Sequence, residues 1–203
     1  MRWCLAVLVV LGFLFGFCRS AGAEGEKEPA KLRKTERFVV VVVDGLDAGY
    51  VDSDTAPNIN GVGAAGVRVN KVSGVIPATP EAAVATLLTG VGPDRHGADG
   101  AGDRVAVPTL STLLEKRNEG TAFFVAGGIP VSGLTEKTVQ TAADDASLMR
   151  QVIASLRENR PYLTVVVLRG PRTALAKGGA GGQEYQRAVT AADTQVGRLL
   201  RSL

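Results

Sequence analysis

One carboxylate in the sequence stands where α/β proteins commonly bind their ligands. Asp44 directly follows the apolar run 38–43 and precedes Gly45, which lets the backbone turn. Such a run predicts a strand covered on both faces in a parallel sheet, and ligands of these sheets gather at the carboxyl ends of the strands. There Asp44 could bind a hard or borderline cation through its oxygens, or it could form an Asx turn that closes the strand.

Other residues that could do chemistry give weaker signals. Arg169 and Arg172 follow the apolar run 162–168, where they could attract an anion at the strand mouth or remain solvated charges. The glycine-rich segment 178–182 lacks the lysine and the strand–turn–helix setting of a phosphate-binding loop, so we interpret it as a flexible loop over the site. Three acidic residues among glycines lack the pattern of an EF-hand calcium loop: Asp94, Asp99 and Asp103.

The segment 1–23 has the pattern of a secretory signal peptide. Arg2 precedes an apolar run of thirteen residues, 5–17, and Ala21-Gly22-Ala23 forms a cleavage site before Glu24. Thirteen residues are short for a membrane span, which needs roughly 20. The alternative is an uncleaved N-terminal membrane anchor. We therefore expect an extracytoplasmic protein, secreted or in the cell envelope.

Composition excludes several classes of protein. The chain has 203 residues, about one domain, and its 45% hydrophobic and 21% charged residues exclude a disordered tail or a collagen-like fibre. Removing 1–23 takes away two of the 23 basic residues and none of the 20 acidic ones, which leaves a charge of +1 and predicts no nucleic-acid partner. Both cysteines, Cys4 and Cys18, lie in that segment, so the mature chain has no thiolate for a metal.

Beyond a charged linker at 24–36, the apolar patterns predict one α/β domain over 37–203. Apolar runs predict strands at 38–43, 121–125 and 162–168. Apolar periodicity, prolines and glycines predict the intervening and following helices, at 57–66, 81–89, 108–117, from about 144 onward, and at 185–203. Strands that alternate with helices indicate a mostly parallel sheet flanked by helices.

Three sequence blocks resemble one enzyme family. They read V-V-D-G-L at 42–46, T-A-P-N-I-N-G-V-G-A-A-G-V at 55–67 and P-A-T-P-E-A-A-V-A-T-L-L-T-G-V-G-P-D-R-H-G at 77–97. Their order and spacing are similar to those of the type I phosphodiesterase/nucleotide pyrophosphatase branch of the alkaline phosphatase superfamily. The resemblance implies an alkaline phosphatase-like fold, incomplete at the C-terminus. It also implies hydrolysis of phosphate esters or anhydrides with two metal ions, usually zinc, and a threonine nucleophile.

The resemblance assigns site residues, several of which depart from the family pattern. Asp44 matches the first metal ligand. Thr79 is the candidate nucleophile, but the family register falls on Pro80, and Thr79 could instead serve only as the N-cap of a helix that begins with that proline. The family's Asp-x-x-x-His motif falls on Arg172 and Ala176, so we expect Arg172 to bind an anion or to replace a cation.

The histidine count argues against the family's full metal site. The resemblance implies three histidine ligands, whereas this chain has one histidine. His96 lies in the P-D-R-H-G turn, where family members carry a histidine that is not a metal ligand, so we interpret it as a hydrogen-bonded turn residue. We therefore expect at most one zinc or other divalent ion, or none.

These observations predict an exported phosphodiesterase/nucleotide pyrophosphatase-like protein that acts on phosphate esters with impaired catalysis. The alternatives are a pseudophosphatase that binds an anionic ligand or a partner in the strand-end cleft, and a fragment of a longer gene. The expected ligand is a phosphate ester or another anionic small molecule, and no membrane span is expected after signal cleavage. Because further strands follow the last helix in the family fold, we expect an exposed sheet edge through which the chain forms a homo-oligomer.

Overall fold

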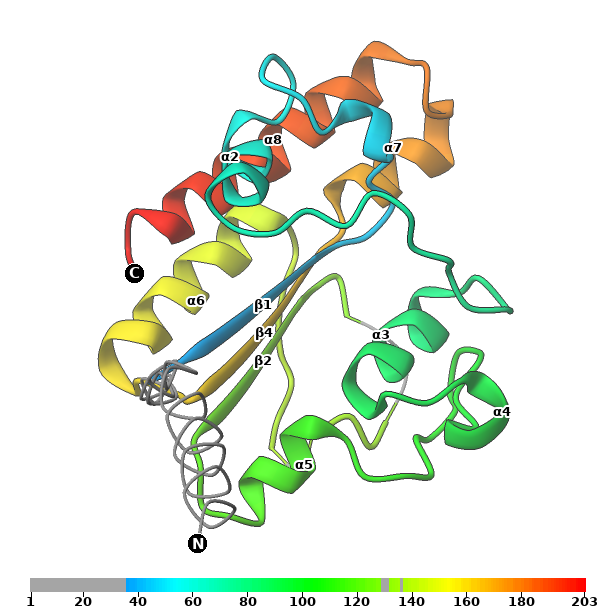
Figure 1. The fold of residues 1–203 in the computed structure, drawn as a ribbon, viewed down its shortest axis with the longest axis vertical. Coiled ribbons are helices and arrows are strands. Elements are labelled where there is room, and N and C mark those ends of the chain that lie inside the picture. Colours follow the sequence, from blue (N-terminus) through cyan, green and yellow to red (C-terminus); the bar gives the residue numbers. More distant parts are fainter. Residues whose placement is uncertain (1–35, 129–131, 136) are drawn as a thin grey trace, which may run out of the picture. The chain divides into compact units, whose positions relative to one another are not determined.

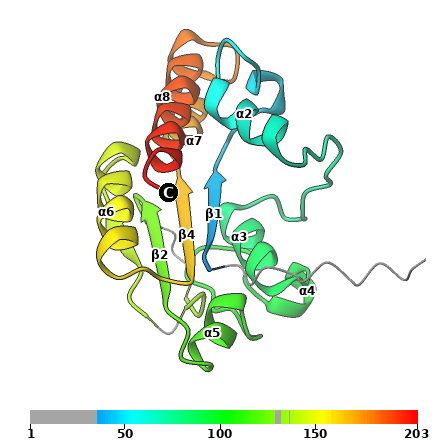
Figure 2. The ribbon, with the colours of Figure 1, turned by 60° about the vertical axis from the view of Figure 1, so that its left-hand side comes forward.

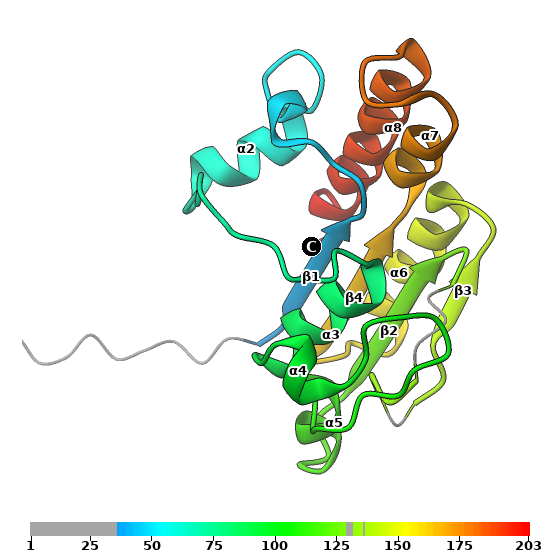
Figure 3. The same cartoon turned by 90° about the vertical axis from the view of Figure 1, so that its right-hand side faces the viewer.

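The computed structural model describes residues 36–128, 132–135 and 137–203, so the predicted signal peptide and nearly all of the linker lie outside the described residues. The described chain contains a parallel sheet of four strands in the order β1-β4-β2-β3, seen side by side in Figure 3. The strands are β1 (Phe38–Val43), β2 (Thr121–Ala126), β3 (Gln140–Ala142) and β4 (Leu163–Leu168). The prediction of a parallel α/β fold is confirmed.

Helices follow the strands along the chain, largely where the sequence predicts them (Figure 1). The predicted helices are α2 (Pro57–Ala65), α3 (Pro80–Thr89), α5 (Leu110–Glu115), α6 (Asp145–Glu158) and α8 (Gln183–Leu200). The structure adds a short 3-10 helix η2 (Ala48–Tyr50) and two helices, α4 (Pro93–His96) and α7 (Gly170–Gly178). It also adds β3, whose three residues are too few and too polar to give a strand signal.

Local sequence explains where two of these helices begin and end. Thr79 accepts a hydrogen bond from the Ala82 N–H as the N-cap of α3, and Gly90 ends that helix in the left-handed conformation at φ +72°. Asp144 caps α6 in the same way by accepting from the Ser147 N–H at 2.8 Å. These caps satisfy backbone groups that a helix end leaves without partners.

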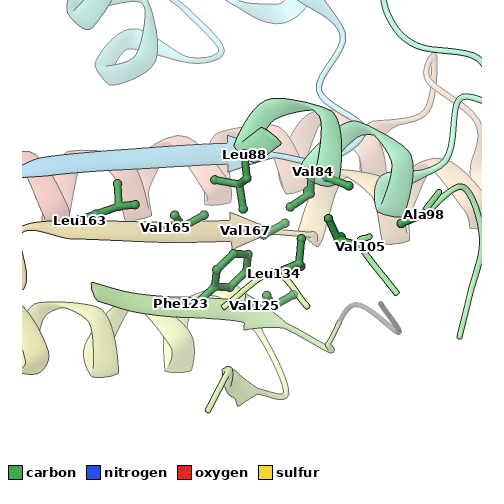
Figure 4. Close-up of a cluster of buried hydrophobic side chains, with 11 residues drawn as sticks. Val84, Leu88, Ala98, Val105, Phe123, Val125, Leu134, Leu163, Val165 and Val167 are labelled. Atoms are coloured by element: carbon green, nitrogen blue, oxygen red, sulfur yellow. The ribbon is translucent and has the colours of Figure 1, made fainter. Parts of the chain in front are cut away.

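The sheet lies between two layers of helices (Figure 2). On one face, Val84 and Leu88 of α3 pack on alternate residues of β2 and β4, and Figure 4 shows this cluster. On the other face, α6 and α8 pack on the intervening residues of the same strands. Since both faces of β4 are covered, all six of its residues are buried. The apolar residues in the second half of α8, Ala192, Val196 and Leu199, pack on the sheet, whereas Tyr185 and Val189 pack with Ala56 and Ala174 in a separate cluster.

The structure confirms the predicted strand at 38–43 and adds its position in the sheet, which the sequence did not predict. Its five consecutive valines predict a strand covered on both faces, but β1 pairs with β4 alone among the described strands and lies at the edge of the sheet. Its valines are half-buried, and Phe38 is 48% exposed. An apolar run indicates that both faces of the strand contact other groups, but it does not indicate whether the strand lies at the centre or at the edge of the sheet. Pairing of two copies through this edge stays a prediction.

The segment that follows β4 differs from the prediction. Residues 170–178, for which no helix was predicted, form helix α7, and 178–182 connect α7 to α8. The Tyr50 hydroxyl donates a hydrogen bond to the Ala180 carbonyl at 2.7 Å, which fastens this connection to the segment after β1. Leu203 lies beyond the end of α8 and is 65% exposed, so it does not extend the packed face of that helix.

Candidate functional site

The register between β1 and β4 brings two charged side chains together at the carboxyl ends of the strands. Val43 pairs with Leu168, and the next residues along the two parallel strands are Asp44 and Arg169. The Asp44 N–H donates to the Leu168 carbonyl at 2.9 Å, so the alignment continues one residue beyond β1. Parallel strands end at the same edge, where α/β proteins place their ligand sites.

Asp44 forms an ion pair with Arg169. Its Oδ2 atom lies 3.4 Å from Arg169 Nε, and the two side chains are 13% and 27% exposed. A second nitrogen of the guanidinium, Nη1, donates a hydrogen bond to the Gly128 carbonyl at 2.6 Å. The sequence predicted that Arg172 binds an anion or replaces a cation, and that role stays a prediction, whereas the guanidinium that faces the Asp44 carboxylate belongs to Arg169. The strand register selects Arg169, and an alignment to a family motif does not contain that information.

Asp145 anchors the backbone of Arg169, a role that the sequence did not reveal. Its two carboxylate oxygens accept hydrogen bonds from the Arg169 N–H at 2.8 Å and the Gly170 N–H at 2.9 Å. Asp145 thus binds the first turn of α7. Its position in the sequence predicts only that its negative charge stabilises the N-terminus of its own helix, α6. The residues concerned are more than twenty positions apart, so local pattern gives no signal for this contact.

A pocket of about 170 Å³ contains the three predicted site residues Asp44, Thr79 and Arg172. The remaining lining residues are small or apolar: Gly74, Val75, Ala78, Pro80 and Ala83. The pocket therefore joins the end of β1 to the first turns of α3 and α7. The structure brings the predicted residues together, while their chemical roles stay predictions.

The Thr79 hydroxyl has two hydrogen-bond partners. It accepts from the Ala82 N–H at 3.1 Å, and it donates to the Asp99 carbonyl at 2.7 Å. Pro80 occupies the first helical position, so the interpretation of Thr79 as a helix cap is confirmed. A backbone carbonyl is not a base that could remove the hydroxyl proton, so these contacts do not activate Thr79 as a nucleophile.

Arg172 lines the pocket, and its guanidinium has no partner among the described residues. Its backbone N–H donates to the Asp44 carbonyl at 3.0 Å, which fixes α7 against the end of β1. Its side chain has no hydrogen bond or ion pair with the rest of the described chain. Ala176, which aligns with the family histidine, is exposed on α7. An arginine whose donors lack protein partners can bind carboxylate or phosphate oxygens.

His96 is a structural residue, as its turn predicts. The side chain is fully buried, its Nδ1 accepts a hydrogen bond from the Ala98 N–H at 3.1 Å, and its Nε2 lies 3.0 Å from the Thr86 hydroxyl. Since Nδ1 accepts, the ring carries its proton on Nε2, which donates a hydrogen bond to the Thr86 hydroxyl. Both ring nitrogens are therefore engaged, and neither is available to a metal.

The residues around Asp44 do not fit a zinc ion. Within the described ranges, no three histidine, cysteine, aspartate or glutamate side chains form a group that could hold a metal. Asp44 faces a guanidinium, whose positive charge opposes a divalent cation. The acidic residues among glycines were a weaker candidate for a metal site. There the Gly100 and Asp99 N–H groups donate hydrogen bonds to the Asp103 carboxylate and lower its pKa, so this carboxylate closes a turn.

In the part of the chain that the structure describes, we find no helix with the length and apolar character that a membrane span requires.

Comparison with known proteins supports the family resemblance. Residues 38–100 match the model of the family described as type I phosphodiesterase / nucleotide pyrophosphatase. No curated protein matches the chain by sequence at a significant level. Among solved structures, phosphonoacetate hydrolase from Sinorhizobium meliloti 1021, in complex with phosphonoacetate, is similar with a TM-score of 0.62 and 15% identity, covering 82% of this chain and 53% of that one.

Two structures of murine ectonucleotide pyrophosphatase/phosphodiesterase 5 are also similar. The first has a TM-score of 0.64 and 14% identity, covering 81% of this chain and 52% of that one. The second, an inactive variant in complex with AMP, has the same TM-score and identity, and the match covers 82% of this chain and 52% of that one. This chain thus spans about half the length of the solved structures that it matches. The resemblance to the type I phosphodiesterase/nucleotide pyrophosphatase family is therefore confirmed by sequence over residues 38–100, and the solved structures show that the fold is shared over most of the chain.

Proposed function

We propose that this chain is a phosphodiesterase-type hydrolase-family protein that binds the phosphoryl group of a phosphate ester in the Asp44–Thr79–Arg172 pocket and hydrolyses it poorly. The observation that carries the proposal is that Arg172 lines the pocket and that its guanidinium has no partner among the described residues. The alternative of a pseudophosphatase shares the binding step and differs only in having no turnover at all.

The electrostatics of the pocket favour an anion. The ten-residue helix α3 begins at the pocket with Pro80, and the N-terminus of a helix carries partial positive charge. The Asp44 carboxylate would repel an anion, but Arg169 balances its charge. Arg172 then supplies a planar set of donors that matches the oxygens of a phosphoryl group.

Poor hydrolysis follows from the surroundings of the candidate nucleophile. A threonine hydroxyl attacks phosphorus only when a base, a metal or a lowered pKa activates it. The Thr79 hydroxyl donates a hydrogen bond to a backbone carbonyl, and the carboxylate in the same pocket, Asp44, is paired with Arg169. No histidine lines the pocket in the described chain. We therefore propose that binding is retained and that the chemical step is slow.

Isothermal titration calorimetry tests the binding. Phosphonoacetate and AMP, which are bound in the similar structures, serve as probes together with inorganic phosphate. We expect Arg172→Ala to weaken binding of these probes about tenfold or more, because it removes a charge-assisted contact. Lys177→Ala removes one positive charge from the same helix at an exposed ion pair with Glu184, so it should leave the affinity unchanged. Equal affinities of wild type and Arg172→Ala would refute the proposed site.

Turnover of bis-p-nitrophenyl phosphate tests the chemical step. We expect wild type to stay at or near the uncatalysed rate, because the Thr79 hydroxyl donates to a backbone carbonyl rather than to a base and the described residues around Asp44 do not fit a zinc ion. Brisk turnover that Thr79→Ala abolishes would identify an active hydrolase and refute impaired catalysis.

We also propose that the mature protein is exported and begins at Glu24, as the pattern of 1–23 suggests. N-terminal sequencing of protein from the extracytoplasmic fraction should return Glu24 as the first residue. Protein in that fraction that still begins at Met1 would favour the membrane anchor instead.

A further inference from the structure

The Asp44 carboxylate has a counter-ion within the chain. The family resemblance assigns Asp44 to a metal ion, yet the nearest charge in the structure is the Arg169 guanidinium, 3.4 Å from Oδ2. Asp44 Oδ2 and Arg169 Nε are both buried and have no hydrogen-bond partner. Buried charged atoms without hydrogen bonds are unfavourable unless an opposite charge compensates them, and here each of the two atoms compensates the other.

The backbone makes this pairing a consequence of the fold. Val43 and Leu168 are register partners in parallel strands, so the residues that follow them leave the sheet side by side. The Asp44 N–H bonds to the Leu168 carbonyl, and the Asp44 carbonyl accepts from the Arg172 N–H. The main chain of Asp44 is thus fixed on both sides, and from this position its carboxylate lies 3.4 Å from Arg169 Nε.

Arg169 is held in place at both its ends. Asp145 binds the Arg169 N–H, and the Gly128 carbonyl binds Nη1 at the tip of the side chain. Gly170 makes the approach of Asp145 feasible, because a Cβ atom on residue 170 would lie only 2.7 Å from Asp145 Oδ2. A side chain fixed at its backbone and at its tip loses little further entropy when it pairs with a carboxylate.

We propose that Arg169 is the resident counter-ion of Asp44 and takes the place of a divalent cation at this carboxylate. Asp145 and Gly170 are positioning residues for it. The inference concerns what neutralises Asp44, and it stands whether or not the pocket binds a phosphate ester. It has two consequences that can be measured: Asp44 and Arg169 are energetically coupled, and Asp44 does not contribute to zinc binding.

A double-mutant cycle in the purified mature protein tests the coupling. Asp44→Asn, Arg169→Met and the double variant are compared with wild type by denaturant unfolding. Each single variant leaves one charge of the pair without its counter-ion, so both should be destabilised, while the double variant should recover part of the loss. We expect a coupling of about tenfold in the unfolding equilibrium constant. Arg172→Met is the matched control, because Arg172 has no ion pair with Asp44, and its effect should add to that of Asp44→Asn.

A zinc titration of wild type and Asp44→Asn by calorimetry completes the test and does not require Arg169→Met to fold. We expect the two proteins to give the same zinc isotherm. Additive effects of Asp44→Asn and Arg169→Met would overturn the proposal. So would wild-type zinc binding that Asp44→Asn weakens tenfold or more, because that result would show Asp44 to be a metal ligand.

Discussion

Asp193 and Asn58, 135 residues apart in the chain, are joined by a hydrogen bond of 2.6 Å between the Asn58 side-chain amide and Asp193 Oδ2. The other carboxylate oxygen, Oδ1, accepts from the Ile59 N–H at 2.8 Å. Helix α2 has Ala56 as its N-cap, which cannot cap it with a side chain. Asp193 on α8 therefore supplies the missing cap from another helix, and it connects the segment after β1 to the helical layer above the sheet.

Asp193→Ala should destabilise the protein by about 3 kcal/mol, because it leaves two half-buried donors on α2 without an acceptor. The measurement is the free energy of unfolding from urea denaturation. Glu184→Ala on the same helix is the control, since its ion pair with Lys177 is largely exposed and should contribute about 0.5 kcal/mol or less. If the two variants lose equal stability, the capping role of Asp193 is wrong.

Tyr185→Phe should destabilise the protein by about 2 kcal/mol. The buried Tyr185 hydroxyl donates to the Gly45 carbonyl and accepts from the Asp47 N–H, both at 2.8 Å. Its removal leaves both backbone groups of the turn after β1 without this partner. Tyr162→Phe is the matched control, because the Tyr162 hydroxyl has no hydrogen bond within the described residues. Thermal unfolding of the two variants should therefore give clearly different midpoints.

Gly45→Ala should lower the free energy of unfolding more than Gly90→Ala does, although both glycines have a left-handed backbone, at φ +77° and +72°. A Cβ atom at residue 45 would lie 2.6 Å from the Arg172 Cα atom, whereas one at residue 90 would meet nothing within 4 Å. We expect Gly90→Ala to lose about 1 kcal/mol of unfolding free energy, because alanine is strained in the left-handed conformation. Gly45→Ala should lose at least about 3 kcal/mol, because the clash with Arg172 adds to that strain. Similar unfolding free energies for the two variants would show that α7 can move away from β1 without cost.

Stability should fall in acid partly through Asp144. The Ser147 N–H, which donates to its carboxylate, holds the pKa of Asp144 below its ordinary value. Because the folded-state pKa is the lower one, the unfolded chain takes up the proton first, so the stabilisation is present above about pH 4 and is lost as the pH falls through the folded pKa. Asp144→Asn keeps a good helix cap but cannot titrate.

Unfolding midpoints measured from neutral pH down to acid should therefore fall less steeply for Asp144→Asn than for wild type. The two proteins should be similar at neutral pH, where the asparagine still caps α6. Parallel curves throughout the acid range would show that the Asp144 carboxylate is not stabilised in the folded state.

The sequence by itself determined the fold class and the local features that depend on near neighbours. Uninterrupted apolar runs predicted β2 and β4, and Thr79 followed by Pro80 predicted the start of α3. The P-D-R-H-G turn predicted a structural role for His96. Periodicity and capping depend on residues within about four positions of one another, so the order of residues is enough to reveal them.

The tertiary structure decided which distant residues meet. It placed β1 at the sheet edge, made 170–178 a helix, and chose Arg169 rather than Arg172 as the partner of Asp44. The pairing of residue 44 with residue 169 follows from the strand register, which depends on side-chain packing over both faces of the sheet. A family motif also could not reveal it, because Arg169 lies outside the aligned Asp-x-x-x-His positions and acquires its role only when β4 packs beside β1.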